Sequence, residues 1–248
     1  MLAHDLASAL DPVLFAVEAL GFHPDPSQTK VLRWPGKRLL LNCSRQWGKS
    51  TTTSVLALHR AVFYPNSLIL LVSPSLRQSS ELFRKVSGFM DRLALKPNMV
   101  EDNRLSLELE NGSRIVSLPS KEATVRGFSG ASLIIEDEAS RVDDLLYKTM
   151  RPMLAVSGGR LVLMSTPFGR RGHFHSEWMD GGPAWERIEV KATDCPRIPQ
   201  SFLEEERASL GEWWFRQEYL CEFVETLDQV FSYSLVMGAL TDEVKPLF

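Results

Sequence analysis

The segment from residue 43 to residue 51 reads CSRQWGKST and carries residue types that bind phosphate. It lies between an apolar run of strand length, RLLLNC, and a stretch with helical periodicity. Its backbone N–H groups would therefore sit at the start of a helix, where they and the helix dipole attract anions. A lysine at this point reaches the outer phosphates of a nucleotide, and a hydroxyl can ligate Mg²⁺. Lys49, Ser50 and Thr51 have the side chains for these roles.

The first half of this loop departs from the usual phosphate-binding pattern. Cys43 stands where a glycine is usual, and the bulky side chains of Arg45 and Trp47 occupy the interior. A glycine-lysine turn without a ligand is the alternative, but the flanking strand and helix favour a phosphate loop. We predict that the Arg45 guanidinium lies within reach of the γ-phosphate and that Trp47 packs over the loop. The predicted nucleotide contacts from this segment are Ser44, Arg45, Gln46, Trp47, Gly48, Lys49, Ser50 and Thr51.

An acidic pair, Asp137 and Glu138, follows another apolar run, SLII. Open α/β sheets bind ligands at the carboxyl ends of their strands, which is where this pair would emerge. Such a pair is often only a solvated turn, but its combination with a phosphate loop favours a nucleotide site. We predict that Ser50 and Asp137 hold Mg²⁺ and that Glu138 acts as base or orients the attacking water. The neighbouring acids Glu136, Asp143 and Asp144 are expected to be solvated.

The elements that position these motifs alternate between strand and helix. Apolar runs at residues 38–43, 67–73, 131–137 and 160–166 are typical of strands buried on both faces. Helical stretches between them indicate a largely parallel sheet flanked by helices, which is the α/β class. Alternating apolar residues on both sides of Asn111-Gly112 predict a hairpin. The expected helices span residues 1–20, 49–64, 76–95 and 200–222.

The strand-helix alternation stops at about residue 170. Turns and one long helix follow, so we predict a P-loop core over residues 1–170, a lid or linker subdomain over 171–226 and a tail over 227–248. The HFH sequence at residues 173–175 lacks a third metal ligand nearby, and it predicts packing of Phe174 rather than a metal site.

Composition excludes several classes of protein. The chain has 248 residues and a formal net charge of −3, so any contact with nucleic acid must come from a local basic patch. Cys43, Cys195 and Cys221 lack the spacing of a zinc site or a disulfide framework. No apolar run is long enough to cross a bilayer, and the N-terminal segment lacks the basic start of a signal peptide. We expect a soluble, intracellular protein.

Together, these motifs resemble the ATPase domain of the large terminase subunit, the DNA-packaging motor of tailed bacteriophages. The resemblance covers about residues 25–225, and five segments carry it: CSRQWGKST, VSPSLRQS, ATVRGFSGASLIIEDEAS, LMSTPFG and FRQEYLCEF. It implies a P-loop NTPase fold of the ASCE type with a mostly parallel central sheet and a small C-terminal lid. The family's loop often lacks the first glycine and carries an arginine before the Gly-Lys pair, which Arg45 matches.

The resemblance assigns roles to further residues. Arg126 matches the arginine finger that a neighbouring subunit supplies, although the sequence alone favours a surface arginine. Ser165 and Thr166 match the coupling motif beside the γ-phosphate, with a plain strand-end turn as the alternative. Gln28 matches the glutamine that reads the adenine edge, because an amide both donates and accepts. The implied catalytic set is Glu138, Arg126, Lys49, Arg45 and Thr166.

A further group of polar residues could meet DNA phosphates, although a solvated helix face would also explain them. These residues are Ser73, Arg77, Gln78, Arg84 and Lys85.

The resemblance also implies a function. It predicts a Mg²⁺-dependent ATPase that drives double-stranded DNA into a procapsid, in the cytoplasm of an infected bacterium and away from any membrane. The implied partners are DNA, a homo-oligomeric ring (a pentamer on the portal), the portal protein and the small terminase subunit. A helicase-like translocase and a nucleotide-dependent binding module without hydrolysis are the alternatives.

Nuclease activity is not expected in this chain. Large terminases usually continue into a nuclease domain whose converging carboxylates bind two metal ions. The tail offers only Asp228, Asp242 and Glu243, without strands to hold them. We therefore expect an ATPase domain without its nuclease partner.

Overall fold

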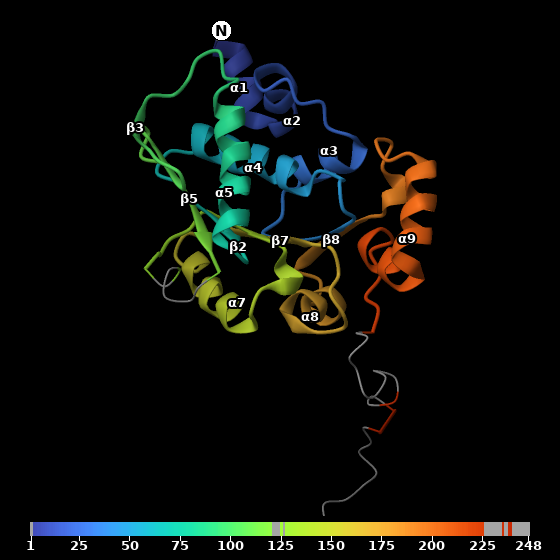
Figure 1. Cartoon of the computed structure of the whole chain (residues 1–248). Helices are drawn as coiled ribbons and strands as arrows, with labels where there is room; N and C mark the ends of the chain where they lie inside the picture. Colours follow the sequence, from blue (N-terminus) through green and yellow to red (C-terminus); the bar gives the residue numbers. More distant parts are fainter. Residues whose placement is uncertain (1, 121–124, 126, 226–234, 236–237, 240–248) are drawn as a thin grey trace, which may run out of the picture.

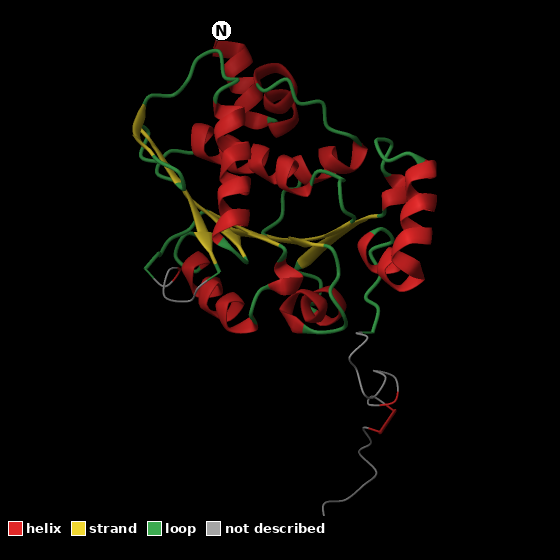
Figure 2. Ribbon diagram, viewed as in Figure 1, coloured by secondary structure: helices red, strands yellow, loops and turns green. Residues whose placement is uncertain are grey.

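A mixed sheet of eight strands runs through the middle of the described chain (Figures 1 and 2). The computed structural model describes residues 2–120, 125, 127–225, 235 and 238–239. In chain order the strands are β1 (Arg38–Cys43), β2 (Leu68–Ser73), β3 (Met99–Asp102), β4 (Ser106–Leu109), β5 (Arg114–Pro119), β6 (Leu133–Asp137), β7 (Arg160–Ser165) and β8 (Trp185–Val190).

Most neighbouring strands in this sheet are parallel. The spatial order is β3-β4-β5-β2-β6-β7-β1-β8, and every neighbouring pair from β5 to β8 is parallel. The hairpin of β4 and β5 and the short β3 add an antiparallel edge. The carboxyl ends of β1, β7 and β6 therefore lie side by side, which brings the phosphate loop and the acidic pair to the same edge. This arrangement confirms the predicted α/β class with a mostly parallel sheet.

Helices cover both faces of the sheet. The helices α1 to α5 lie on one face, α7 and α8 lie on the other, and α9 lies beyond the edge strand β8 (Figure 1). Their bounds are α1 (Leu2–Leu10), α2 (Pro12–Leu14) followed by a π-helical turn (Phe15–Ala19), α3 (Pro26–Leu32), α4 (Lys49–Phe63), α5 (Leu76–Met90), α7 (Asp144–Met150), α8 (Gly172–Asp180) and α9 (Gln200–Glu218), with short 3₁₀ turns at Ala139–Arg141, Arg151–Leu154 and Ala192–Asp194.

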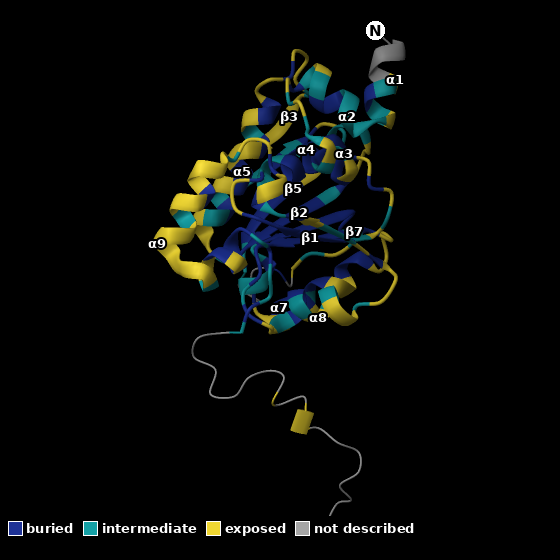
Figure 3. Cartoon of the chain, turned by 90° about the vertical axis from the view of Figure 1, so that its right-hand side faces the viewer, coloured by how far each residue is buried: buried dark blue, intermediate teal, exposed yellow. Residues whose placement is uncertain are grey.

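Two apolar cores form on the two faces of the sheet. Successive residues of a strand point to opposite faces, so Leu39 and Leu41 enter the core under α3 to α5 while Leu40 enters the core over α7 and α8. Because both faces are covered, the central strands are apolar at almost every position, and Figure 3 shows them buried. This double cover explains why the strands could be found in the sequence as continuous apolar runs.

Several helix bounds differ from the prediction. The expected N-terminal helix breaks at Asp11, whose side chain accepts a hydrogen bond from Val13 N–H at 2.9 Å and so starts a new helix at Pro12. Proline has no N–H to continue the previous helix. The helix predicted to reach residue 95 ends at Met90. The predicted hairpin is confirmed, and in its loop Gly112 has φ of 77°.

The sequence did not predict β8. This strand pairs in parallel with β1 along its whole length, so the main sheet continues beyond residue 170. Further along the chain, α9 is exposed over most of its surface (Figure 3) and carries a small apolar cluster of its own, which includes Leu203, Phe215 and Tyr219. The predicted boundary at residue 170 stays a prediction, and most of the predicted tail lies outside the described residues.

No helix within the described ranges has both the length and the apolar character needed to cross a membrane.

Candidate nucleotide-binding site

The phosphate loop begins directly after β1 and owes its shape to two left-handed residues. Cys43 is the last residue of the strand and is fully buried, so a side chain is tolerated where a glycine is usual. Gln46 and Gly48 have φ of 62° and 101°. A Cβ on Gly48 would lie 3.0 Å from Gln28 Nε2, so both the dihedral and the available space call for glycine.

The backbone N–H groups of the loop fall into two sets. Ser44 N–H donates to the carbonyl oxygen of Val190 at 2.9 Å, and Arg45 N–H donates to that of Glu218 at 3.2 Å, so β8 and α9 hold the start of the loop. The N–H groups of residues 46–51 donate to no other atom of the described chain. They lie at the N-terminus of a fifteen-residue helix, which makes this end of the loop an anion site.

Lys49 and Ser50 open α4 and face the acidic strand. Lys49 Nζ donates to the carbonyl oxygens of Cys43 at 3.1 Å and Ser44 at 3.2 Å, which keeps the ammonium over the loop. Ser50 Oγ donates to Asp137 Oδ2 at 3.4 Å. The structure thus brings together the two side chains that we predicted to hold Mg²⁺.

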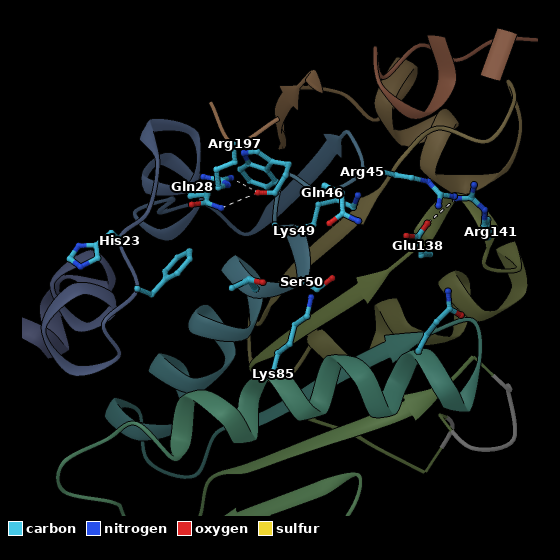
Figure 4. Close-up of a pocket in the computed structure, with 15 residues that line it drawn as sticks. His23, Gln28, Arg45, Gln46, Lys49, Ser50, Lys85, Glu138, Arg141 and Arg197 are labelled. Carbon is cyan, nitrogen blue, oxygen red and sulfur yellow. Dashed lines mark hydrogen bonds and ion pairs between the residues drawn. The ribbon is translucent and has the colours of Figure 1, made fainter. Parts of the chain in front are cut away.

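A pocket of about 640 Å³ lies over this loop (Figure 4). It contains every predicted nucleotide contact except Ser44, which is fully buried below the loop. Arg45, Glu138 and Arg141 lie at one end of the pocket, and His23, Gln28 and Arg197 lie at the other. The lining residues are Phe22, His23, Gln28, Arg45, Gln46, Trp47, Gly48, Lys49, Ser50, Thr51, Gln78, Lys85, Glu138, Arg141 and Arg197.

Asp137 ends β6, and Glu138 follows it. Burial, and then the negative charge of Glu138, raise the pKa of Asp137 to about 6. Glu138 has a left-handed backbone with φ of 53°, which turns its side chain away from the strand. Its carboxylate binds Arg141, with Oε2 2.8 Å from the Nη1 atom, and Ser165 Oγ is 3.5 Å from the same oxygen. The predicted base is therefore in the pocket and held by an arginine.

Glu218 connects two arginines of the site and was missed by the sequence analysis. Its buried carboxylate binds Arg45 Nε at 2.6 Å and Arg141 Nη2 at 3.1 Å. Burial alone would raise the pKa of Glu218, but the hydrogen bond from Arg45 and the charges of both arginines lower it below its ordinary value. An ion-pair chain thus runs from Arg45 through Glu218 and Arg141 to Glu138. Arg45 lines the pocket, and Glu218 holds its guanidinium. Its reach to the γ-phosphate stays a prediction.

The predicted coupling motif, Ser165 and Thr166, contacts this chain of ion pairs and the loop beside it. Arg141 Nη1 donates to Thr166 Oγ1 at 3.3 Å, and the guanidinium lies 4.8 Å from the ring centre of Phe168. Ser140 Oγ is 2.7 Å from Ser165 Oγ and donates to the carbonyl oxygen of Thr166 at 2.8 Å. The end of β7 therefore touches the loop that carries Glu138, although neither Ser165 nor Thr166 lines the pocket.

Gln28 lies at the opposite end of the pocket, where protein atoms already bind its amide. Nε2 donates to the carbonyl oxygen of Trp47 at 3.1 Å, and Oε1 accepts from Asp25 N–H at 3.0 Å. Arg197 joins this group, because its Nη2 atom binds the same Trp47 oxygen at 2.6 Å and Asp25 Oδ2 at 2.9 Å. The adenine-reading role of Gln28 stays a prediction, and the neighbouring Arg197 was not foreseen.

The prediction that Glu136 is solvated was wrong. Its side chain is fully buried on the face of the sheet away from the pocket, and Oε2 lies 3.2 Å from His173 Nε2. Burial raises the pKa of Glu136; it would lower that of His173, but hydrogen bonds to Glu136 and Asp144 raise it overall. Because Ile135 and Asp137 face α4, strand alternation sends Glu136 to the other side. The packing predicted for Phe174 is confirmed, since this residue is fully buried in α8.

The remaining candidate residues are scattered. Gln78 and Lys85 line the nucleotide pocket, Arg84 pairs with Glu81 on the surface at 3.0 Å, and Ser73 is buried. Arg126, the predicted arginine finger, lies outside the described residues. Its role stays a prediction.

Fold and site together define a class of protein. A buried parallel strand leads through a glycine-dependent loop into a helix that begins with lysine and serine. A second strand brings Asp137 against that serine and is followed by Glu138, which lines the same pocket. This combination is that of a P-loop nucleotide-binding domain.

Comparison with known proteins identifies the family within that class. Residues 40–236 match the family model described as "Terminase large subunit, T4likevirus-type, N-terminal". Because the match covers most of the chain, the protein belongs to this family, which confirms the resemblance drawn from the sequence. The large terminase subunit of Escherichia phage T5 is 27% identical over 232 residues, which are 89% of this chain and 52% of that protein. The chain thus spans about half the length of the curated relatives it matches.

Solved structures agree with this assignment. A structure of the large terminase ATPase domain of Thermus phage P74-26 has a TM-score of 0.77 and 25% identity, covering 87% of this chain and all of the other. The large terminase of another thermophilic bacteriophage, solved in complex with ATP-γ-S, has a TM-score of 0.66 and 14% identity over 80% of this chain and 52% of the other. At that identity the likeness concerns the fold alone.

Proposed function

We propose that this chain binds ATP over the phosphate loop and hydrolyses it with the help of Mg²⁺. One observation carries the proposal: a single pocket is lined by residues 46–51, with their free N–H groups, and by Glu138, and Ser50 in its wall contacts the buried Asp137. The family membership and the ATP-γ-S complex of the thermophilic-phage terminase support it.

The residues present fit a magnesium ion. Ser50 Oγ and Asp137 Oδ2 lie within 3.4 Å of each other and are the hard oxygen ligands that Mg²⁺ prefers. Within the described ranges there is no group of three or more His, Cys, Asp and Glu that could hold a metal ion. A metal at Ser50 and Asp137 would therefore complete its shell with water and phosphate oxygens. When bound, Mg²⁺ would neutralise charge that develops on the phosphates.

The chain's own residues supply the remaining chemistry. The loop N–H groups and Lys49 hold the phosphates in place. Glu138 accepts a proton from water as the water oxygen bonds to the γ-phosphorus and the bond to the β–γ bridging oxygen breaks. For this step the Glu138 carboxylate must be free of Arg141, and Arg45 must leave Glu218 to reach the γ-phosphate.

The Glu138→Gln variant tests the catalytic assignment. We expect it to bind ATP-γ-S like the parent and to lose about 10²–10⁴-fold in turnover, because an amide cannot accept the proton. Glu205→Gln is the control, since Glu205 is exposed on α9. Parental turnover by Glu138→Gln would refute the role of Glu138. Nucleotide binding by the parent without any turnover would instead support a nucleotide-dependent binding module.

We further propose that hydrolysis serves to move double-stranded DNA into a procapsid, in the cytoplasm of an infected bacterium. The proposed partners are a homo-oligomeric ring, with five subunits on the portal, the portal protein and the small terminase subunit. The family membership supports this proposal. A packaging motor also needs contacts that transmit nucleotide hydrolysis from the site to neighbouring elements. The contacts between Arg141, Thr166 and Phe168 provide such a path.

Mixing two inactive variants tests the ring and the arginine finger. If Arg126 acts in a neighbour's site, Arg126→Ala and Glu138→Ala subunits should partly restore ATPase activity when they assemble together, because some sites then receive both intact groups. Size-exclusion chromatography with light scattering must show that mixed rings form. Absence of rescue in such rings would contradict a role in trans.

A further inference from the structure

A second pocket, of about 560 Å³, lies at the edge of the sheet opposite to the nucleotide pocket. Its walls include Leu133 and Arg160, which are the first residues of β6 and β7, and Arg60 near the end of α4. The nucleotide pocket lies at the other ends of these three elements. The lining residues are Leu10, Asp11, Pro12, Leu32, Arg33, Trp34, Pro35, Leu56, His59, Arg60, Tyr64, Leu133 and Arg160.

This pocket carries an excess of positive charge. Asp11 is the one acid among the described residues that line it, and Arg33 neutralises it through two hydrogen bonds, at 3.1 and 2.6 Å. Arg60 and Arg160 have no carboxylate within ion-pair distance in the part of the chain that the structure describes. Two guanidinium charges therefore share the pocket without a counter-ion, although the chain as a whole has a net charge of −3.

Neighbouring groups fix both guanidiniums in place. Arg160 donates from Nε to the carbonyl oxygen of Gly36 at 3.0 Å and from Nη2 to that of Trp34, whose ring centre lies 4.2 Å from the guanidinium carbon. Arg60 lies 4.1 Å from the ring centre of Tyr64, and its Nε is buried without a hydrogen-bond partner. Burial lowers the pKa of Arg60, and burial and then the charge of Arg60 lower that of Arg160 to about 10. With a pKa of about 10, Arg160 stays charged near neutral pH, and the charge of Arg60 adds to the cost of burying it.

We propose that this pocket binds a phosphate group, carried by free phosphate or by a small phosphate ester. Two uncompensated guanidiniums match the charge of a phosphate dianion. Two nitrogens of Arg160 already bind carbonyl oxygens, and its Nη1 atom is left to donate to a ligand. The pocket is larger than a bare phosphate needs. Leu10, Leu32 and Leu56 form an apolar wall that an ester's organic part could contact.

The same helix and strand connect this pocket to the nucleotide site. Arg60 lies in the same helix as Lys49, and Arg160 lies in the same strand as Ser165. A helix of fifteen residues is about 22 Å long, so the two pockets are separate sites joined by rigid elements. The proposal does not depend on ATP hydrolysis.

The experiment must separate this pocket from the phosphate loop, which also attracts phosphate. We therefore use a Lys49→Ala background and measure the melting temperature in inorganic phosphate against chloride at equal ionic strength. At phosphate well above its dissociation constant, an increase of about 3–5 °C is expected. Adding Arg60→Gln should remove most of the increase, whereas adding Arg207→Gln, an equal charge change on the exposed surface of α9, should preserve it.

Two further measurements close the test. Wild-type protein saturated with ATP-γ-S should still gain stability from phosphate, because the proposed pocket is then the free one. Phenyl phosphate distinguishes the sources: a larger shift than that of phosphate points to an ester, and an equal shift points to free phosphate. An unchanged phosphate shift in Lys49→Ala/Arg60→Gln, or no shift in Lys49→Ala, would overturn the proposal.

Discussion

Arg45 in the phosphate loop and Glu218 at the end of α9 are 173 residues apart in the chain and form an ion pair of 2.6 Å. The Arg45 backbone N–H also donates to the carbonyl oxygen of Glu218. The loop that would hold the nucleotide is thus bound at two points to the helix beyond the sheet edge. A ligand that draws the guanidinium away from Glu218 must loosen one of these two contacts.

Glu218→Gln should strengthen nucleotide binding. Loss of the carboxylate charge frees Arg45 for the γ-phosphate, and a competing contact of about 1 kcal/mol corresponds to about a fivefold tighter Kd. The same change should lower the free energy of unfolding by about 1–2 kcal/mol, a value kept small because Arg45 is 60% exposed. Titration with a fluorescent ATP analogue measures the first effect, with Glu205→Gln as control. Weaker binding by Glu218→Gln would show that the ion pair does not compete with the nucleotide.

Two glycine substitutions should have opposite effects on stability. Gly48→Ala places a side chain at φ of 101° and 3.0 Å from Gln28, so we expect a loss of about 1–3 kcal/mol and weaker nucleotide binding. Gly88→Ala adds a Cβ in the last turn of α5, with no atom within 4 Å, and should stabilise by about 0.4–1 kcal/mol. Urea unfolding curves of both variants measure the difference. Equal stability of the two would contradict the loop geometry.

His59 should make the protein less stable in mild acid. It lies among Phe15, Phe63 and Tyr64, and burial lowers its pKa below the ordinary 6.5. The unfolded chain therefore binds a proton at a pH where the folded protein does not, and the free energy of unfolding falls as the pH drops below about 6.5. The slope is at most about 1.4 kcal/mol per pH unit. Urea unfolding at about pH 7.5 and 5.5 should show a smaller loss for His59→Gln. An equal loss in both proteins would exclude His59 as the cause.

All three cysteines should be unreactive in the folded protein. Cys43, Cys195 and Cys221 are buried, and burial raises the pKa of Cys43 to about 12 and also raises that of Cys221. Since the thiolate is the reacting form, a thiol reagent should label none of them natively and all three in denaturant. Mass spectrometry counts the labels. Rapid native labelling at Cys43 would mean that the start of the phosphate loop opens in solution.

The central strands and the loop could be predicted because their signals are local. Leu39 to Leu41 form an apolar run that only a doubly covered strand explains, and Gly48 to Ser50 come after it at the end of a short loop. The strand β8 gave no such signal. Glu186 and Glu189 are exposed along it, and its partner β1 is more than a hundred residues away.

The ion-pair chain of the site could not be predicted for a related reason. A charged residue in a sequence does not reveal which opposite charge it will meet, and Glu218 meets Arg45 and Arg141 only after α9 has packed beside β8. The one available signal was its place between Phe215 and Tyr219, both buried. Glu136 could have been placed correctly, because strand alternation puts it opposite to Asp137.

Trp47 affects the thermodynamics of ligand binding. Its ring is 1% exposed within the main apolar core, and its carbonyl oxygen binds both Gln28 and Arg197. The tryptophan thereby anchors the loop to the core through contacts within the chain itself. Most of the conformational entropy of the loop is lost when the chain folds, and little is left to lose when a phosphate arrives. A preorganised loop of this kind favours fast, repeated exchange of nucleotide, because neither binding nor release requires the loop to refold.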